Sequence, residues 1–172
     1  KGVGFMQLTI DGHKRCSAAD AFIKPIKKNN KLTIKTNSMV VKLLFDKKKV
    51  IGVEYIEKNK LKKIYCNNEV ILTSGSFQTP KILMLSGIGP ENELKKHQIN
   101  ILKKLEGVGK NLQDHFEVPV VASTKSGYGY YKQDKGLKKY INGLQYLLFN
   151  SGPVMSNGCE SVAYYNPVND KK

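Results

Sequence analysis

GSFQTPKILMLSGIG, residues 75–89, places glycines, hydroxyl side chains and one proline at set offsets around a short apolar run. Thr79 has the side chain of a helix N-cap, Pro80 suits the first helical position, and Gly87 suits a helix end. Residues 81–85 supply the helix between them. The sequence therefore predicts a short capped helix that starts at Pro80 and stops at Gly87.

A short apolar run, EVILT at residues 69–73, comes directly before this segment. Such runs are typical of strands that are buried on both faces of a parallel sheet. Ligands of open α/β sheets bind beyond the carboxyl ends of those strands. Ser74 and Gly75 occupy that position, so they are candidate ligand-binding residues.

Three segments rich in β-branched and aromatic residues precede the run, at residues 40–45, 50–56 and 61–65. Polar, lysine-rich connections at residues 46–49 and 58–60 separate them. This spacing predicts an antiparallel meander with polar hairpin turns. Residues 32–36 also alternate as a strand does. The expected fold class is α/β, with an α+β character from the meander.

The character of the sequence changes after GVGKNLQDH, residues 107–115. Residues 118–122 read as a strand, and residues 159–165 as another. Apolar residues recur at helical spacing between about residue 135 and residue 149, which predicts an amphipathic helix. We therefore expect a domain boundary after residue 115.

The formal charge of +15 raises the alternative of a nucleic-acid-binding module. Arg15 is the only arginine among 29 basic residues, whereas phosphate-reading sites usually exploit the bidentate guanidinium. The lysines fall mainly at expected turns and solvent-facing strand positions. This distribution favours a solvated surface and no nucleic-acid partner.

Cys16, Cys66 and Cys159 lie far apart, without a CxxC pair or a histidine at metal-ligand spacing. They predict neither a disulfide framework nor a metal site, and free thiols favour a cytoplasmic location. No apolar run approaches the roughly 20 residues of a membrane helix. Because the chain starts at Lys1 rather than methionine, we expect an internal piece of a longer protein.

Several segments together resemble the glucose-methanol-choline (GMC) oxidoreductases, a family of FAD-dependent enzymes. The resemblance covers essentially the whole chain and rests on residues 2–7, 12–19, 79–80, 86–89 and 111–115. It implies FAD as the cofactor and a Rossmann-like FAD-binding domain. Residues 1–115 would form its middle and second part, and residues 116–172 the start of an antiparallel-sheet substrate domain.

The resemblance also implies site residues. In the family, a valine in a Thr-x-x-x-Val segment meets the FAD adenine through its backbone, and Val40 in residues 36–40 matches it. The alternative is a valine that only packs in the core. Ser74 and Gly75 are weaker candidates for cofactor contact, since glycine lets backbone approach a cofactor closely.

Glu160 is the candidate substrate contact, because choline-oxidising members place a glutamate of a similar segment against the ammonium group. The alternative is a glutamate held by the sheet in enzymes of uncharged alcohols. Asp114 and His115 suggest an acid–base pair. In the family, however, the catalytic histidine lies far towards the C-terminus, so His115 is expected to be structural and no catalytic residue is assigned here.

The resemblance implies an FAD-dependent oxidoreductase acting on the CH–OH group of an alcohol, choline or another primary alcohol, with hydride transfer to flavin N5. Two departures qualify this: the Gly-x-Gly-x-x-Gly fingerprint and the region of the catalytic histidine are absent from these 172 residues. We therefore expect the chain alone neither to retain FAD nor to oxidise alcohol. A catalytically dead structural relative remains the other alternative.

Overall fold

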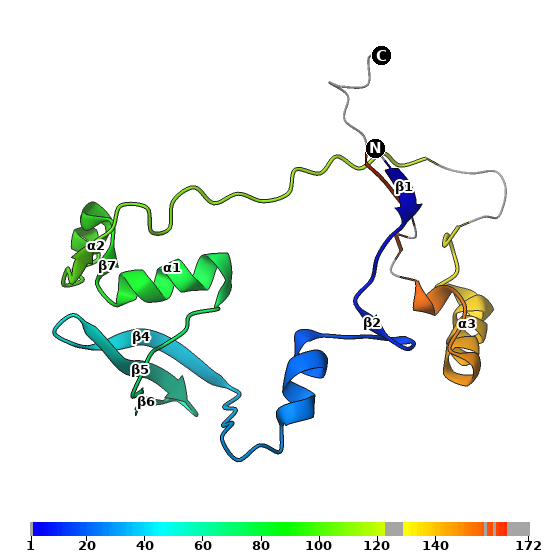
Figure 1. Ribbon diagram of the computed structural model, residues 1–172. Helices are drawn as coiled ribbons and strands as arrows, with labels where there is room; N and C mark the ends of the chain where they lie inside the picture. Colours follow the sequence, from blue (N-terminus) through cyan, green and yellow to red (C-terminus); the bar gives the residue numbers. More distant parts are fainter. Residues whose placement is uncertain (1, 123–128, 157, 160, 165–172) are drawn as a thin grey trace. The chain divides into compact units, whose positions relative to one another are not determined.

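The computed structural model describes residues 2–122, 129–156, 158–159 and 161–164. These residues divide into two compact units. Unit 1 combines residues 1–32 with residues 119–172, and unit 2 comprises residues 33–118. The expected boundary after residue 115 stays a prediction. Helices and antiparallel strands occur in both units, as the α/β class with α+β character requires (Figure 1).

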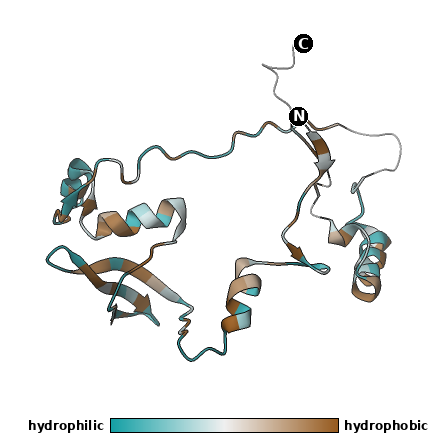
Figure 2. Ribbon diagram, viewed as in Figure 1, coloured by the Kyte–Doolittle hydropathy of each residue, from teal (hydrophilic) through white to brown (hydrophobic). Residues whose placement is uncertain are grey.

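Unit 2 is built on the predicted meander, which is confirmed. β4 (Ser38–Asp46), β5 (Lys49–Glu57) and β6 (Lys60–Tyr65) form an antiparallel sheet in the order β4-β5-β6. Hydrophobic and hydrophilic residues are mixed along these strands (Figure 2). Leu43 and Tyr55 are buried, so one face of the sheet carries part of the small core.

A buried carboxylate lies in the middle strand of this sheet. Glu54 is only 8% exposed, and its oxygens lie 3.5 Å from Lys42 Nζ and 3.9 Å from Lys63 Nζ. Lys42 and Lys63 are its cross-strand partners in β4 and β6. Because a buried charge is costly without a partner, the two lysines explain why the strand tolerates Glu54.

α1 (Gly75–Leu85) packs on β4, and its more hydrophobic C-terminal half contains the buried Ile82 (Figure 2). α2 (Glu91–Lys96) follows, with Leu94 buried. β7 (Ile88–Gly89) lies between the two helices in the chain, and β8 (Lys103–Lys104) follows α2. The two strands pair in parallel.

Unit 1 joins segments from both ends of the chain. β1 (Gly2–Phe5) pairs antiparallel with β9 (Ser161–Tyr164), and β2 (Ile10–Asp11) pairs with β3 (Lys14–Arg15) in a hairpin. The other elements are the π-helix Ala19–Ile23, the 3-10 helices Lys24–Ile26 and Pro153–Met155, and α3 (Gly136–Phe149). α3 confirms the amphipathic helix expected over residues 135–149.

Three of the strand predictions are wrong. Residues 32–36, 69–73 and 118–122 form no strand, and Ile71, Val120 and Val121 are exposed. An apolar or alternating run records a preference for a pleated, buried surface, but a strand also needs a hydrogen-bonded neighbour. No strand in the described part of the chain pairs with these segments.

Candidate functional site

Val40, the proposed adenine contact, lies near the start of β4 opposite Tyr55 and is half-buried. β4 is an edge strand of the described sheet, so part of its backbone has no strand partner. The β4-β5 register also shifts between Val40 and Lys42. Such a shift disrupts the ladder locally and re-aims backbone groups. Val40 thus lies where main-chain groups can serve a ligand.

Ser74 and Gly75 form the entry into α1, and both are exposed. Ser74 is the N-cap residue but makes no side-chain capping bond. Gly75 has φ +82°, and apart from the adjoining backbone no described atom lies within 4 Å of where a Cβ would stand. Since the first N–H groups of a helix lack helical partners, this end of α1 presents free donors beside open space.

The start of α1 differs from the expectation that Thr79 caps it and Pro80 opens it. The helix begins at Gly75 and contains Pro80 in its second turn. A proline there cannot donate the helical hydrogen bond to the carbonyl group four residues earlier. Packing of the apolar C-terminal half, where Ile82 is 5% exposed, outweighs this local preference.

Ser86 joins α1 to β4. The backbone N–H of Leu43 donates to Ser86 Oγ (2.8 Å), and that hydroxyl donates to the carbonyl oxygen of Ile82 (2.6 Å). In Figure 1, α1 and β4 both run from right to left, so their first residues lie on the same side of unit 2. The bond therefore holds together the two elements that carry the three cofactor candidates. This role of Ser86 was not predicted from the sequence.

A pocket of about 480 Å³ brings together residues 75–89 and residues 107–115, the two signature segments of the chain. Ser76, Phe77, Pro80 and Met84 of α1 line one part of it, and residues 109–113 line the other. A Cβ built on Gly109 would lie 3.3 Å from Met84 Cε, so the loop passes close to the helix. The sequence placed both segments in one domain but could not show this contact, which spans 25 positions of the chain.

Asp114 and His115 do not form an acid–base pair in the structure. Both residues are exposed, and the backbone N–H of His115 donates to Asp114 Oδ1 (2.8 Å). Within the described residues, the imidazole ring of His115 has no hydrogen-bond partner. This geometry gives the ring no group to activate it, and the structural role expected for His115 stays a prediction.

An ion-pair network fixes the segment after α1. Glu91 Oε1 lies 2.6 Å from Lys95 Nζ, and Glu91 Oε2 lies 3.0 Å from Lys104 Nζ. Hydrogen bonds from these two lysines lower the pKa of Glu91 to about 2. The network ties α2 to β8 and lies among the surface lysines that raise the chain's net charge.

Neither a metal cluster nor a membrane-spanning helix occurs among the described residues. No group of three or more histidine, cysteine or acidic side chains there is arranged to hold a metal ion. None of the helices described is both long and apolar enough to cross a membrane. Glu160, the predicted substrate contact, lies outside the described residues.

Comparison with known proteins establishes the family. The model of the GMC oxidoreductase N-terminal domain matches residues 1–117, which is more than half of the chain. The chain therefore belongs to the GMC oxidoreductase family, and the resemblance seen in the sequence is confirmed.

Two curated relatives are named choline dehydrogenases. The mitochondrial choline dehydrogenase of Mus musculus is 36% identical over 152 residues, which cover 88% of this chain and 26% of that protein. The oxygen-dependent choline dehydrogenase of Brucella canis is 36% identical over 165 residues, covering 95% of this chain and 30% of that protein. The chain thus spans less than a third of the length of these relatives.

Solved structures share the fold. An FAD-dependent oxidoreductase from Chaetomium thermophilum matches 93% of this chain and 29% of its own, with TM-score 0.82 and 26% identity. A variant formate oxidase of Aspergillus oryzae matches 79% of this chain and 24% of its own, with TM-score 0.72 and 35% identity. Both likenesses agree with the mixed helix and antiparallel-sheet architecture.

Proposed function

We propose that this chain is part of an FAD-dependent oxidoreductase that acts on the CH–OH group of an alcohol. Residues 1–115 would belong to the FAD-binding domain, and residues 116–172 to the start of the substrate domain. The match of the GMC family over residues 1–117 is the observation that carries the proposal. The packing of both signature segments around one pocket of unit 2 supports it.

The residues at the start of α1 fit a dinucleotide cofactor. Gly75 leaves open space where a side chain would stand, and the uncapped helix start offers N–H donors to a phosphate or a ribose hydroxyl. Ser74 and Gly75 would hold this part of FAD, and the backbone of Val40 would meet the adenine edge. The flavin supplies the hydride acceptor that amino-acid side chains lack.

The substrate proposed is a small primary alcohol. Two curated relatives named choline dehydrogenases, each 36% identical, support a cationic alcohol, and Glu160 is the residue proposed to face its ammonium group. The competing proposal is an uncharged alcohol, with Glu160 held by the sheet. Replacing Glu160 with glutamine separates the two: a loss confined to cationic substrates supports the first, and an equal loss on all substrates supports the second.

Nucleic acid is not among the partners proposed. Eight lysines of the described residues form ion pairs within the chain, as Lys62 with Glu57 and Lys104 with Glu91 illustrate. Ion-paired lysines have less free charge to offer to phosphates. A cytoplasmic location also stays a proposal, based on the absence of a disulfide framework in the cysteine spacing; the mouse relative is named mitochondrial.

The test is made on the product of the whole gene that contains this sequence. Purified, it should show the visible absorbance of oxidised flavin, and anaerobic addition of a primary alcohol should bleach that band. The 172-residue chain alone should show no flavin band. A full product without flavin, or with flavin that no alcohol reduces, contradicts the proposal. Gly75→Val should lower the flavin content because the side chain would fill the space beside α1.

A further inference from the structure

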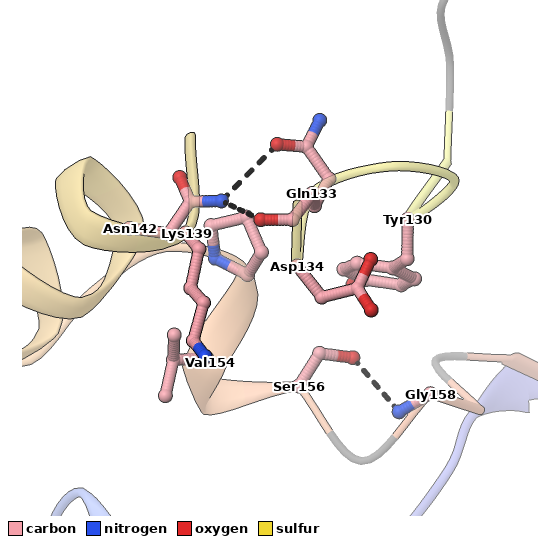
Figure 3. A pocket seen from close by; sticks show the side chains of 9 residues that line it. Tyr130, Gln133, Asp134, Lys139, Asn142, Val154, Ser156 and Gly158 are labelled. Atoms are coloured by element: carbon pink, nitrogen blue, oxygen red, sulfur yellow. Dashed lines mark hydrogen bonds between the residues drawn. The ribbon is translucent and has the colours of Figure 1, made fainter. Parts of the chain in front are cut away.

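A second pocket, in unit 1, has a volume of about 540 Å³, within the range of small-molecule sites (Figure 3). The loop before α3, α3 itself and the segment around the last 3-10 helix all contribute to its wall. The polar side chains of the wall belong to Tyr130, Gln133, Asp134, Lys139, Asn142 and Ser156. None of these residues belongs to the proposed cofactor site, which lies in unit 2.

The wall of this pocket is held together by side-chain hydrogen bonds. Asn142 Nδ2 donates to the carbonyl oxygen of Gln133 (2.9 Å) and to Gln133 Oε1 (3.2 Å) (Figure 3). These bonds fasten the loop before α3 to the helix. The residues that the loop and the helix direct at the pocket therefore keep a defined spacing, as a binding site requires.

Two opposite charges line the same pocket without meeting each other. Asp134 comes from the loop and Lys139 from α3, and in Figure 3 their side chains enter from different sides. In the described part of the chain, neither makes an ion pair, although Lys132 and Lys135 flank Asp134 in sequence. An unpaired carboxylate in a chain of charge +15 is available to a ligand.

Tyr130 adds an aromatic ring to the pocket lining, and it is 41% exposed. Aromatic faces attract cations, and a carboxylate does so more strongly. Asp134 and Tyr130 are thus suited to a cationic nitrogen. Lys139 repels a simple cation but attracts a carboxylate, and Asp134 has the opposite preference. A ligand that carries both charges satisfies both side chains.

We propose that this pocket binds a small zwitterion whose cationic nitrogen lies at Asp134 and Tyr130 and whose carboxylate lies at Lys139. The inference does not depend on the proposed flavin function, because it requires neither the cofactor nor the residues of unit 2. It gives unit 1 a ligand site with its own specificity.

The test uses the 172-residue chain and the series glycine, β-alanine, 4-aminobutyrate and 6-aminohexanoate, with binding followed by NMR chemical shifts of α3 amides. One chain length should bind best, with a Kd in roughly the millimolar range, since only one spacing satisfies both charges. Ethylamine and acetate, which carry one charge each, should bind more weakly.

Charge-removing variants identify the two ends of the ligand. Asp134→Asn and Lys139→Gln should each weaken binding of the best zwitterion by about fivefold, as expected for exposed charges. Lys138→Gln is the matched control, because Lys138 is exposed on the same helix and does not line the pocket. Binding that ignores chain length, binding unchanged in both pocket variants, or no binding by any of the four amino acids overturns the inference.

Discussion

Replacing Ser86 with alanine should destabilise unit 2 by removing one hydroxyl. Leu43 is 7% exposed, and its backbone N–H has Ser86 Oγ as its partner at 2.8 Å. The variant leaves that buried donor unsatisfied. The carbonyl oxygen of Ile82, by contrast, still accepts from the backbone N–H of Ser86 (3.1 Å). One unsatisfied group therefore sets the magnitude, which is about 1–3 kcal/mol in the free energy of unfolding.

Urea denaturation measures this change as a lower midpoint at unchanged slope. Hydrogen exchange gives a local readout, because the Leu43 amide should exchange faster while amides between β5 and β6 keep their protection. Ser86→Thr retains the hydroxyl and should keep most of the stability. Ser76→Ala makes the same chemical change at an exposed position, where the side chain bonds to none of the described residues, and should be nearly neutral. Equal losses at both serines, or unchanged exchange of Leu43 in Ser86→Ala, would refute the reasoning.

Two further predictions concern unit 2. Gly87→Ala should lower the free energy of unfolding by about 3 kcal/mol, because Gly87 has φ +83° and a Cβ would lie 2.4 Å from the carbonyl oxygen of Asn100. Thermal unfolding measures this loss of stability. The pKa of Glu91 is lowered from 4.5 to about 2, so its contribution to stability is full above pH 4.5 and is lost as the pH falls towards 2. Between pH 4.5 and pH 2, the Glu91→Gln variant should therefore lose less stability than the original protein. The same pH dependence of the free energy of unfolding in both proteins would contradict the prediction.

Elements with local signals could be predicted from the sequence. The meander followed from segments rich in β-branched and aromatic residues with polar turns between them, and its turns contain residues that adopt positive φ, namely Lys47, Lys58 and Asn59. α3 followed from apolar residues at helical spacing. In each case the periodicity and the turn chemistry lie within a few residues of one another, so the local pattern determines the local structure.

Features that depend on distant partners could not be predicted. Residues 69–73 have the composition of a buried strand, but composition does not supply the neighbouring strand that would pair with them. The start of α1 was misplaced because packing of Ile82 extends the helix on both sides of Pro80. The role of Ser86 depends on Leu43, which lies 43 positions earlier. A hydroxyl at the end of an apolar helix is the one signal that could have suggested it.

Three residues of the segments 75–89 and 107–115 shape unit 2. Ser86 accepts a hydrogen bond from the backbone of β4, and Gly87 lets the backbone of Asn100 pass close to it. Gly109 brings the second signature segment into contact with Met84. Each requirement concerns how closely two backbone segments approach, and none places an acid, a base or a nucleophile. A relative could therefore keep these residues and lose activity. Evidence for catalysis must come from the flavin content of the whole gene product and from reduction of that flavin by alcohol. Variants of Val40, Ser74 and Gly75 test the first of these, because the three residues are proposed to contact the cofactor.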